Sequence, residues 1–335
     1  MLVKAMSCSR FGAVENLAIA ETAEPALQSG QVRIAVLAAG VNYADALKIE
    51  GRYQVRPALP WIPGTEVGGI VIETARDVKS VRPGMNVMGV SGETGGGLAE
   101  TIALHEDHVI PLPDGFSTAF AAVIPVTYGT ALHSLRQRAR LKAGESVLVL
   151  GAAGGAGLAA VGVAKAMGAT VIAAASTPEK RQLAIDAGAD AAVNYTEARW
   201  PEQVRSMVAA KRVDVVFDPV GGNAFTDAER CIGWGGRYLV VGFAGGDIPT
   251  VQINRPLVKG YDICGIRYDT WRDIYWSEAR QNLKELIEWV SSGQIRPLIS
   301  ARFPMERARD AINSLSSRSA SGKVVLVNRH ASTND

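Results

Sequence analysis

The chain has 335 residues, 47% of them hydrophobic, and its 35 basic and 33 acidic side chains give a formal net charge of +2. Single cores stop growing at roughly 250–300 residues, so two domains are expected. The charges are interspersed without a dense Lys/Arg run, which excludes a polyanion-binding groove and argues against a nucleic-acid partner.

The first 21 residues, MLVKAMSCSRFGAVENLAIAE, lack the apolar stretch of a secretory signal. The chain's three cysteines, Cys8, Cys231 and Cys264, are scattered and odd in number, unlike a disulfide framework or a zinc knot. We therefore expect a cytoplasmic protein with no membrane partner.

The first 120 residues or so contain short alternating segments such as QVRIAVLAAGVN (31–42) and VGGIVIETA (67–75), broken by many glycines and prolines. Helical periodicity is scarce in this part of the chain. The pattern predicts an antiparallel β-rich domain.

Residues 146–164, SVLVLGAAGGAGLAAVGVA, form an uncharged stretch with Gly151, Gly154 and Gly157 spaced G-x-x-G-x-x-G. Half of it is Gly and Ala, which excludes a bilayer span. The aliphatic run before the glycines predicts a strand, and the residues after them suit a helix. Such glycines allow a tight turn, and the amides at a helix N-terminus attract an anion, so we expect a phosphate cradle. The spacing alone is also compatible with a plain strand-to-helix turn.

The chain then alternates between predicted strands and helices. Further strands are expected at 169–176, 190–195, 213–221, 235–245 and 261–267, with helices at 178–188, 200–210 and 222–232. With the strand before the glycines they make six strands, which predicts an α/β, doubly wound parallel sheet with the glycine turn after its first strand. Two amphipathic helices, 277–292 and 305–317, and a last strand, 322–328, are expected to return to the first domain.

Five motifs, in order along the chain, resemble those of a known family. They read AAGVNYADALKIEGRY, LPWIPGTEVGGIV, GGGLAE, LKAGESVLVLGAAGGAGLAAVGVAKAMGA and VDVVFDPVGG. Over about residues 1–328 the chain is similar to the zinc-free quinone oxidoreductase branch of the medium-chain dehydrogenase/reductase superfamily, which includes zeta-crystallin. The resemblance implies a GroES-like catalytic domain (1–125 and 268–335) and a Rossmann NADP-binding domain (126–267). It also implies NADPH as cofactor, quinones or activated alkenes as acceptors, and a homodimer.

Zinc-dependent members of the superfamily bind the metal through a Cys after the first Gly-Val and a His in Gly-His-Glu. The corresponding residues here are Asn42 and Thr65, which cannot replace thiolate and imidazole, so no metal is expected. Glu66 is then expected to be a structural or salt-bridged residue. The histidines, His105, His108, His133 and His330, form no ligand motif. Without a Lewis acid, reduction of an electrophilic acceptor is favoured over oxidation of an alcohol.

The resemblance assigns Asn42 and Thr130 to the nicotinamide pocket, with Thr127 a nearby alternative, and Tyr53 to the wall of the acceptor site. The residues alone also allow simpler roles: a turn or cap for Asn42 and a back-bonding hydroxyl for Thr130. Asp45 is expected to cap or brace the helix that begins there. In some family members a Tyr lies five positions beyond the Asn. This position is Leu47 here, which leaves the proton donor open.

The cofactor contacts are expected at the ends of the parallel strands. In the glycine turn they are Gly154, Gly155 and Ala156, and at the nicotinamide end they are Gly242, Phe243 and Ala244, for which a simple loop turn is the alternative. Asp218 lies at a similar edge and is interpreted as structural, since an unpaired buried carboxylate is costly.

The end of the second strand, IAAAST (172–177), carries no carboxylate for the ribose hydroxyls of NAD. Lys180 and Arg181 follow it and suit the 2′-phosphate of NADP, although a solvated helix face is the alternative. The resemblance assigns this contact to Ser176, Lys180 and Tyr195, with Arg318 a weaker candidate and the edge of the core an alternative place for Tyr195.

The leading hypothesis is an NADPH-dependent, metal-free reductase of a small electrophilic acceptor, a quinone or an α,β-unsaturated carbonyl. Two alternatives remain open. One is an enoyl-thioester reductase of the same superfamily, and the other is a non-catalytic, crystallin-like NADPH-binding protein.

Overall fold

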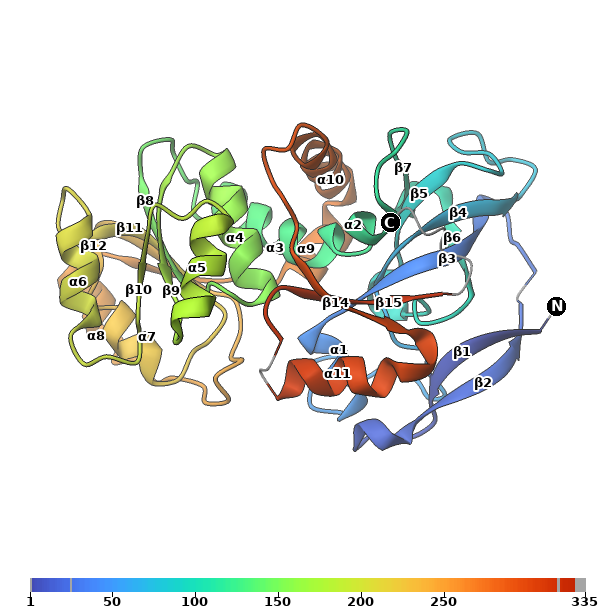
Figure 1. Ribbon diagram of the computed structural model, residues 1–335, viewed down its shortest axis with the longest axis horizontal. Coiled ribbons are helices and arrows are strands. Elements are labelled where there is room, and N and C mark those ends of the chain that lie inside the picture. Colours follow the sequence, from blue (N-terminus) through green and yellow to red (C-terminus); the bar gives the residue numbers. More distant parts are fainter. Residues whose placement is uncertain (1, 25, 318–319, 329–335) are drawn as a thin grey trace. The chain divides into compact units, whose positions relative to one another are not determined.

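The computed structural model describes residues 2–24, 26–317 and 320–328, and it divides the chain into two compact units (Figure 1). The first unit comprises the described residues of 1–126, 283–287 and 299–335, and the second comprises 127–282 and 288–298. This division places residues 268–282 in the second unit, whereas the resemblance assigns them to the catalytic domain. The domain boundaries expected from the sequence stay a prediction.

The first unit is built on a seven-stranded sheet. Its order is β14 (Ile299–Pro304), β15 (Lys323–Val327), β3 (Gln31–Val41), β4 (Glu66–Thr74), β5 (Asn86–Val90) and β7 (Val109–Pro111), while β6 (Thr101–His105) also pairs with β3. All pairs except β14 with β15 are antiparallel. A separate hairpin joins β1 (Leu2–Cys8) to β2 (Leu17–Ala23). This GroES-like arrangement confirms the predicted antiparallel β-rich domain.

Short helices cover the sheet of the first unit. They are α1 (Tyr43–Ile49), α2 (Thr118–Ala121) and α11 (Ala308–Ser316), with 3-10 turns η1 (Val14–Asn16), η2 (Gly92–Thr94), η3 (Glu106–His108) and η6 (Met305–Arg307). Gly40 and Gly68 explain how α2 approaches the strands. A Cβ on Gly40 would overlap the carbonyl oxygen of Ala122, and one on Gly68 would overlap that of Thr118. The glycines in these apolar strands therefore permit close packing rather than a turn.

The second unit contains a six-stranded sheet in which every pair is parallel. Its order is β10 (Ala191–Val193), β9 (Thr170–Ala174), β8 (Ser146–Leu150), β11 (Val213–Asp218), β12 (Ile232–Val240) and β13 (Asp262–Gly265). Numbered within the sheet this is 3-2-1-4-5-6, the Rossmann order. The predicted doubly wound sheet is confirmed, and its first strand is β8.

The helices between these strands are α4 (Gly155–Ala166), α5 (Pro178–Asp186), α6 (Trp200–Met207), α7 (Asn223–Ala228) and α8 (Asn254–Lys259). Figure 1 shows them with the strands in green to orange. The sequence did not predict α8, α9 (Tyr268–Ile274) or α3 (Gly129–His133), which lies between the π-helical turns η4 (Ile124–Tyr128) and η5 (Ser134–Arg138). Helix α10 spans Trp276–Ser291. Among the described residues no helix has the length and apolar character needed to cross a bilayer.

Candidate functional site

The glycine turn links β8 to α4. Gly151 has φ +58°, a left-handed conformation that favours glycine, and a Cβ on Gly157 would collide with the backbone of residues 151 and 152. The first hydrogen bond of α4 runs from the Leu158 N–H to the Gly154 carbonyl (2.8 Å), so the N–H groups of residues 155–157 precede the helical ladder. The predicted contacts Gly154, Gly155 and Ala156 therefore lie at a helix N-terminus suited to a phosphate.

Two further loops meet at the same edge of the parallel sheet. The side chain of Val220 faces Gly151, so the loop after β11 lies against the glycine turn. The Ala244 N–H donates to the Pro219 carbonyl (3.0 Å) and the Gly245 N–H to that of Val220 (2.7 Å). The loop with the predicted residues Gly242, Phe243 and Ala244 is thus joined by hydrogen bonds to the loop after β11.

Asp218 holds the first of these loops in shape. It is 2% exposed, and its carboxylate accepts hydrogen bonds from the Val220 and Gly221 N–H groups and from the Tyr238 hydroxyl (2.7, 2.9 and 2.8 Å). Burial raises the pKa of Asp218, although these hydrogen bonds oppose the shift. The contacts agree with a structural role.

The predicted 2′-phosphate contact lies after β9, where Thr177 caps α5 by accepting a hydrogen bond from the Lys180 N–H (3.3 Å). Ser176, Lys180 and Arg181 are partly exposed around this helix start, and Tyr195 packs against the core beyond β10. Within the described ranges Arg181 Nη1 is buried without a hydrogen-bond partner. An unpaired guanidinium nitrogen beside a strand end without a carboxylate fits a 2′-phosphate. Arg318 lies outside the described residues.

Thr130 lies in α3, where it is partly exposed, whereas the neighbouring Thr127 is 8% exposed. In the described part of the chain, the Thr130 hydroxyl makes no hydrogen bond, so the back-bonding alternative is not observed. The Tyr268 side chain fills the space beside Gly129, where a Cβ would overlap its hydroxyl.

Asn42 belongs to a buried hydrogen-bond network in the first unit. It is the N-cap of α1 and is 7% exposed, and its N–H donates to the Asp45 carboxylate (2.9 Å). Its Nδ2 donates to Glu66 Oε1 (2.9 Å). Lys323 Nζ donates to Asn42 Oδ1 (2.7 Å), to Glu66 Oε1 (2.9 Å) and to the Val41 carbonyl (3.2 Å). The amide of Asn42 is therefore fixed in orientation by a cation on one side and a carboxylate on the other.

Glu66 is the centre of this network. It is fully buried, and its second oxygen, Oε2, accepts from the Val126 N–H (2.8 Å). Both carboxylate oxygens are thus engaged, and the ammonium of Lys323 balances the charge at 2.9 Å. The expectation of a salt-bridged Glu66 agrees with this geometry. Lys323 was missed from the sequence, although a lysine at the start of the apolar strand KVVLV was a signal for it.

Tyr53 follows α1 and is partly buried, with the Lys48 ammonium 5.2 Å from its ring centre. Asp45 is 1% exposed, and burial raises its pKa to about 6 against the opposing effects of the Asn42 N–H, Lys48 and Lys323. The predicted brace of α1 is therefore a buried carboxylate beside two lysines.

The three described histidines, His105, His108 and His133, do not form a cluster. Among the described residues no group of three or more His, Cys, Asp or Glu side chains could hold a metal ion. His105 lies 3.2 Å from Asp107 at the surface, and His133 is buried, stacked on Trp271 with ring centres 4.2 Å apart. Burial lowers the pKa of His133 to about 4. His330 lies outside the described residues.

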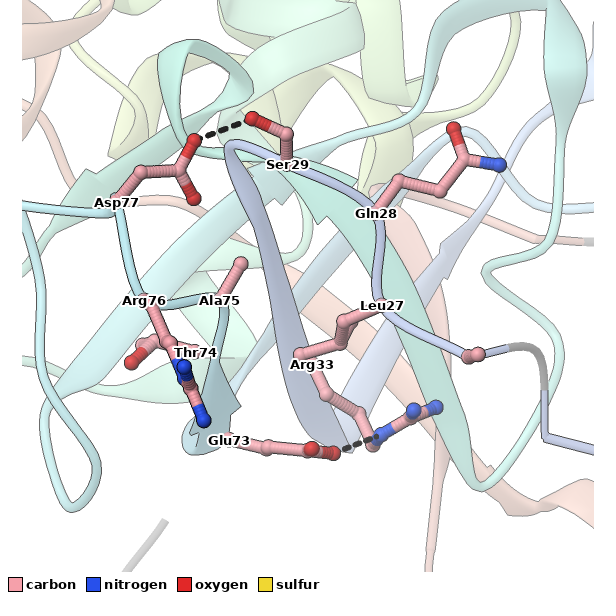
Figure 2. A pocket seen from close by; sticks show the side chains of 10 residues that line it. Leu27, Gln28, Ser29, Arg33, Glu73, Thr74, Ala75, Arg76 and Asp77 are labelled. Carbon is pink, nitrogen blue, oxygen red and sulfur yellow. Dashed lines mark hydrogen bonds and ion pairs between the residues drawn. The ribbon is translucent and has the colours of Figure 1, made fainter.

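A hollow on the first unit contains none of the predicted site residues (Figure 2). It is lined by residues 26–29, Arg33 and 73–77. Within it, Arg33 binds Glu73 at 2.9 Å and Ser29 donates to Asp77. These contacts assign it no chemistry.

Comparison with known proteins identifies the family. A model described as "Alcohol dehydrogenase GroES-like domain" matches residues 28–114, and one described as "Zinc-binding dehydrogenase" matches residues 155–292. Quinone oxidoreductase-like protein 2 of Bos taurus is 39% identical over 311 residues, covering 92% of this chain and 88% of that protein. The chain belongs to the quinone oxidoreductase-like branch of the medium-chain dehydrogenase/reductase superfamily. The resemblance inferred from the motifs is confirmed.

Other members of this branch align over nearly their whole length. Quinone oxidoreductase of Sus scrofa is 32% identical, covering 97% of this chain and 98% of that protein. The structure of mycobacterial Rv1454c complexed with NADPH has a TM-score of 0.88, 28% identity and coverage of 97% and 99%. Escherichia coli quinone oxidoreductase complexed with NADPH has a TM-score of 0.86, 26% identity and the same coverage. The chain is thus an oxidoreductase of this branch.

Proposed function

We propose that this protein binds NADPH and reduces a quinone or an α,β-unsaturated carbonyl without a metal ion. The observation that carries the proposal is the ion pair between the Lys323 ammonium and the Glu66 carboxylate. The residues beside it are Asn42 and Thr65, at the positions where zinc-dependent relatives have a Cys and a His ligand. A cation already neutralises this carboxylate, and the two neutral side chains are poor ligands for zinc.

The cofactor contacts follow from the second unit. The N–H groups at the start of α4 hold the diphosphate. The 2′-phosphate is held by Ser176, Lys180 and Tyr195, together with Arg181. The Gly242–Ala244 loop contacts the nicotinamide half. The two NADPH-bound relatives support this choice of dinucleotide. Bound NADPH supplies the hydride.

The residues of the chain orient the reactants and supply hydrogen bonds. Asn42, fixed by its network, is the candidate of the first unit for contact with the nicotinamide. Thr130 is the candidate of the second unit, and its hydroxyl makes no hydrogen bond to any residue in the described ranges. Tyr53 lines the acceptor site. Because quinones and enones are already electrophilic, positioning and hydrogen-bond donors at the developing charge are sufficient for catalysis.

The test is a turnover assay of the purified protein with NADPH against quinones, enones and enoyl thioesters, together with zinc analysis. Reduction of quinones or enones by metal-free protein is expected. Turnover restricted to enoyl thioesters would favour the alternative of an enoyl-thioester reductase. Tight NADPH binding with no turnover on any acceptor would favour the non-catalytic alternative, and stoichiometric zinc would overturn the metal-free proposal.

A homodimer through the second unit is part of the proposal. Trp234, Ile253, Leu257 and Val258 are 74–84% exposed, and Trp234 packs on Gly260 at the end of α8. Among the described strands, β13 is paired only on its β12 side. An apolar face this exposed beside an open strand edge fits a second copy of the chain. Light scattering should give a dimer mass, and Leu257→Asp should give a monomer. A monomeric wild type would refute it.

A further inference from the structure

Lys48 differs from the other buried lysine described in this chain. Lys48 is 5% exposed and Lys323 is 4% exposed. The Lys323 ammonium has three oxygen acceptors, as described above. Lys48 has no ion pair or hydrogen bond from its ammonium to any residue in the described ranges. The stem of Lys48 is buried, but its Nζ is not among the fully buried unpaired atoms of the described residues, so its N–H donors are open to water or to a ligand.

Two aromatic rings surround this ammonium. Lys48 Nζ lies 5.2 Å from the ring centre of Tyr53 and 5.9 Å from that of Trp61. Trp61 is 5% exposed and is held by a hydrogen bond from its Nε1 to the Thr94 carbonyl (3.1 Å). The rings attract the positive charge but cannot accept all three N–H bonds. They leave donors for an oxygen that enters from outside the chain.

The position of Lys48 connects it to the proposed site. It lies in α1, the helix capped by Asn42, and three residues after Asp45, so the two side chains share a helix face. Tyr53, assigned to the acceptor site, is one of its two rings. The charges of Lys48, Lys323 and Glu66 all act on the pKa of Asp45, so these four side chains influence one another electrostatically. With Glu66 paired to Lys323, Asp45 balances Lys48, which suits a neutral acceptor better than an anionic one.

We propose that Lys48 is a catalytic residue whose ammonium binds the carbonyl oxygen of the acceptor and protonates it after hydride transfer. This inference rests on the proposed function and names the proton donor that Leu47 leaves open. When the hydride forms its bond to the acceptor carbon, an electron pair moves to the acceptor oxygen. An N–H bond of Lys48 breaks as the O–H bond forms, and the neutral amine recovers a proton from water. From an enone the product is an enol, which tautomerises to the saturated carbonyl. From a quinone it is the keto tautomer of a hydroquinone, and the ring carbon that took the hydride then loses a proton while the other oxygen gains one.

The first test measures acceptor reduction by Lys48→Met, which keeps the length of the stem and removes the charge. Loss of one donor to a developing oxyanion costs about 100-fold or more, so kcat/KM for the acceptor should fall about 100-fold. The dissociation constant of Lys48→Met for NADPH should be unchanged. Lys48→Arg should recover part of the acceptor binding but not the proton transfer. Lys79→Met, at an exposed lysine of the same unit, is the matched control. A change within threefold for Lys48→Met would overturn the role of Lys48 and leave the proposed function standing.

The second test does not depend on turnover. p-Nitrophenol, whose ionised form absorbs visible light, mimics the anionic oxygen and is titrated into the NADP⁺-saturated protein. An adjacent cation should favour the phenolate over the phenol about tenfold in the wild type relative to Lys48→Met. If the wild type reduces no acceptor, the proposed function fails and this ratio still decides whether Lys48 binds an oxygen anion. An equal ratio in both proteins, or no binding by the wild type, would refute the inference.

Discussion

The Nζ of Lys323 donates to the Oδ1 of Asn42 at 2.7 Å, across 281 positions of sequence. This contact gives the amide a single orientation, because its Nδ2 then faces the Glu66 carboxylate. The last strand of the first unit therefore positions a residue at the start of α1. The charge of the Glu66 carboxylate is therefore balanced by a cation of the chain itself, the Lys323 ammonium.

Lys323→Met should destabilise the protein strongly, since it leaves the fully buried Glu66 carboxylate without its cation. Breaking one side of a buried pair costs about 3–5 kcal/mol, which urea unfolding would measure. The double variant Lys323→Met/Glu66→Gln removes both charges and should recover most of this loss. A single-variant loss below about 1 kcal/mol would contradict the importance of the pair.

Gly157→Ala and Gly162→Ala form a matched pair on α4. A Cβ at residue 157 would collide with the backbone of the glycine turn, whereas one at residue 162 meets Ile295 at 3.5 Å, an ordinary contact. Gly157→Ala should weaken NADPH binding and lower stability. Gly162→Ala should keep binding and gain up to about 1 kcal/mol from helix propensity. Calorimetric titration with NADPH checks both, and equal binding by the two variants would count against the cradle.

Removing either cation at the start of α5 should change the choice of dinucleotide. Lys180→Ala and Arg181→Ala should each raise the KM for NADPH about tenfold, since one charge-assisted hydrogen bond to the 2′-phosphate contributes about 1.5–3 kcal/mol. The KM for NADH should change little because NADH lacks this phosphate. Steady-state kinetics with both cofactors measures the effect. Parallel changes for NADPH and NADH would remove these residues from the phosphate site.

Asp45 should make stability depend on pH in the acidic range. Its pKa is raised from 3.8 to about 6, so between those values the folded protein retains a proton that the unfolded chain has lost. Stability therefore falls as pH rises through this window, by an amount on the order of 2–3 kcal/mol. Asp45→Asn keeps an oxygen for the Asn42 N–H and should flatten this part of the profile, while Asp114→Asn, at an exposed carboxylate, should not. Unfolding free energies measured from pH 4 to pH 7 would show a slope of the opposite sign if Asp45 were stabilised as the anion.

Local patterns were sufficient for the sheet of the second unit, although not for all of its helices. The alternation of apolar strands with capped helices predicted a parallel sheet, and glycines at 151, 154 and 157 marked the turn after its first strand. Periodicity and turn chemistry act over a few residues, so they are readable in one sequence. Short helices such as α8 and α9 escaped because their apolar residues form no stripe long enough to detect.

The sequence by itself determined the fold class, the turn expected to hold the cofactor phosphates and the absence of the Cys and His ligands at residues 42 and 65. Only the tertiary structure decided how Asn42 is held and which lysines lie near it. Lys323 reaches Asn42 through the pairing of β15 with β3, and Lys48 meets the Trp61 ring after the chain has turned beyond α1. Such contacts depend on strand register and burial, which arise when distant segments pack together and leave no periodic trace along the chain.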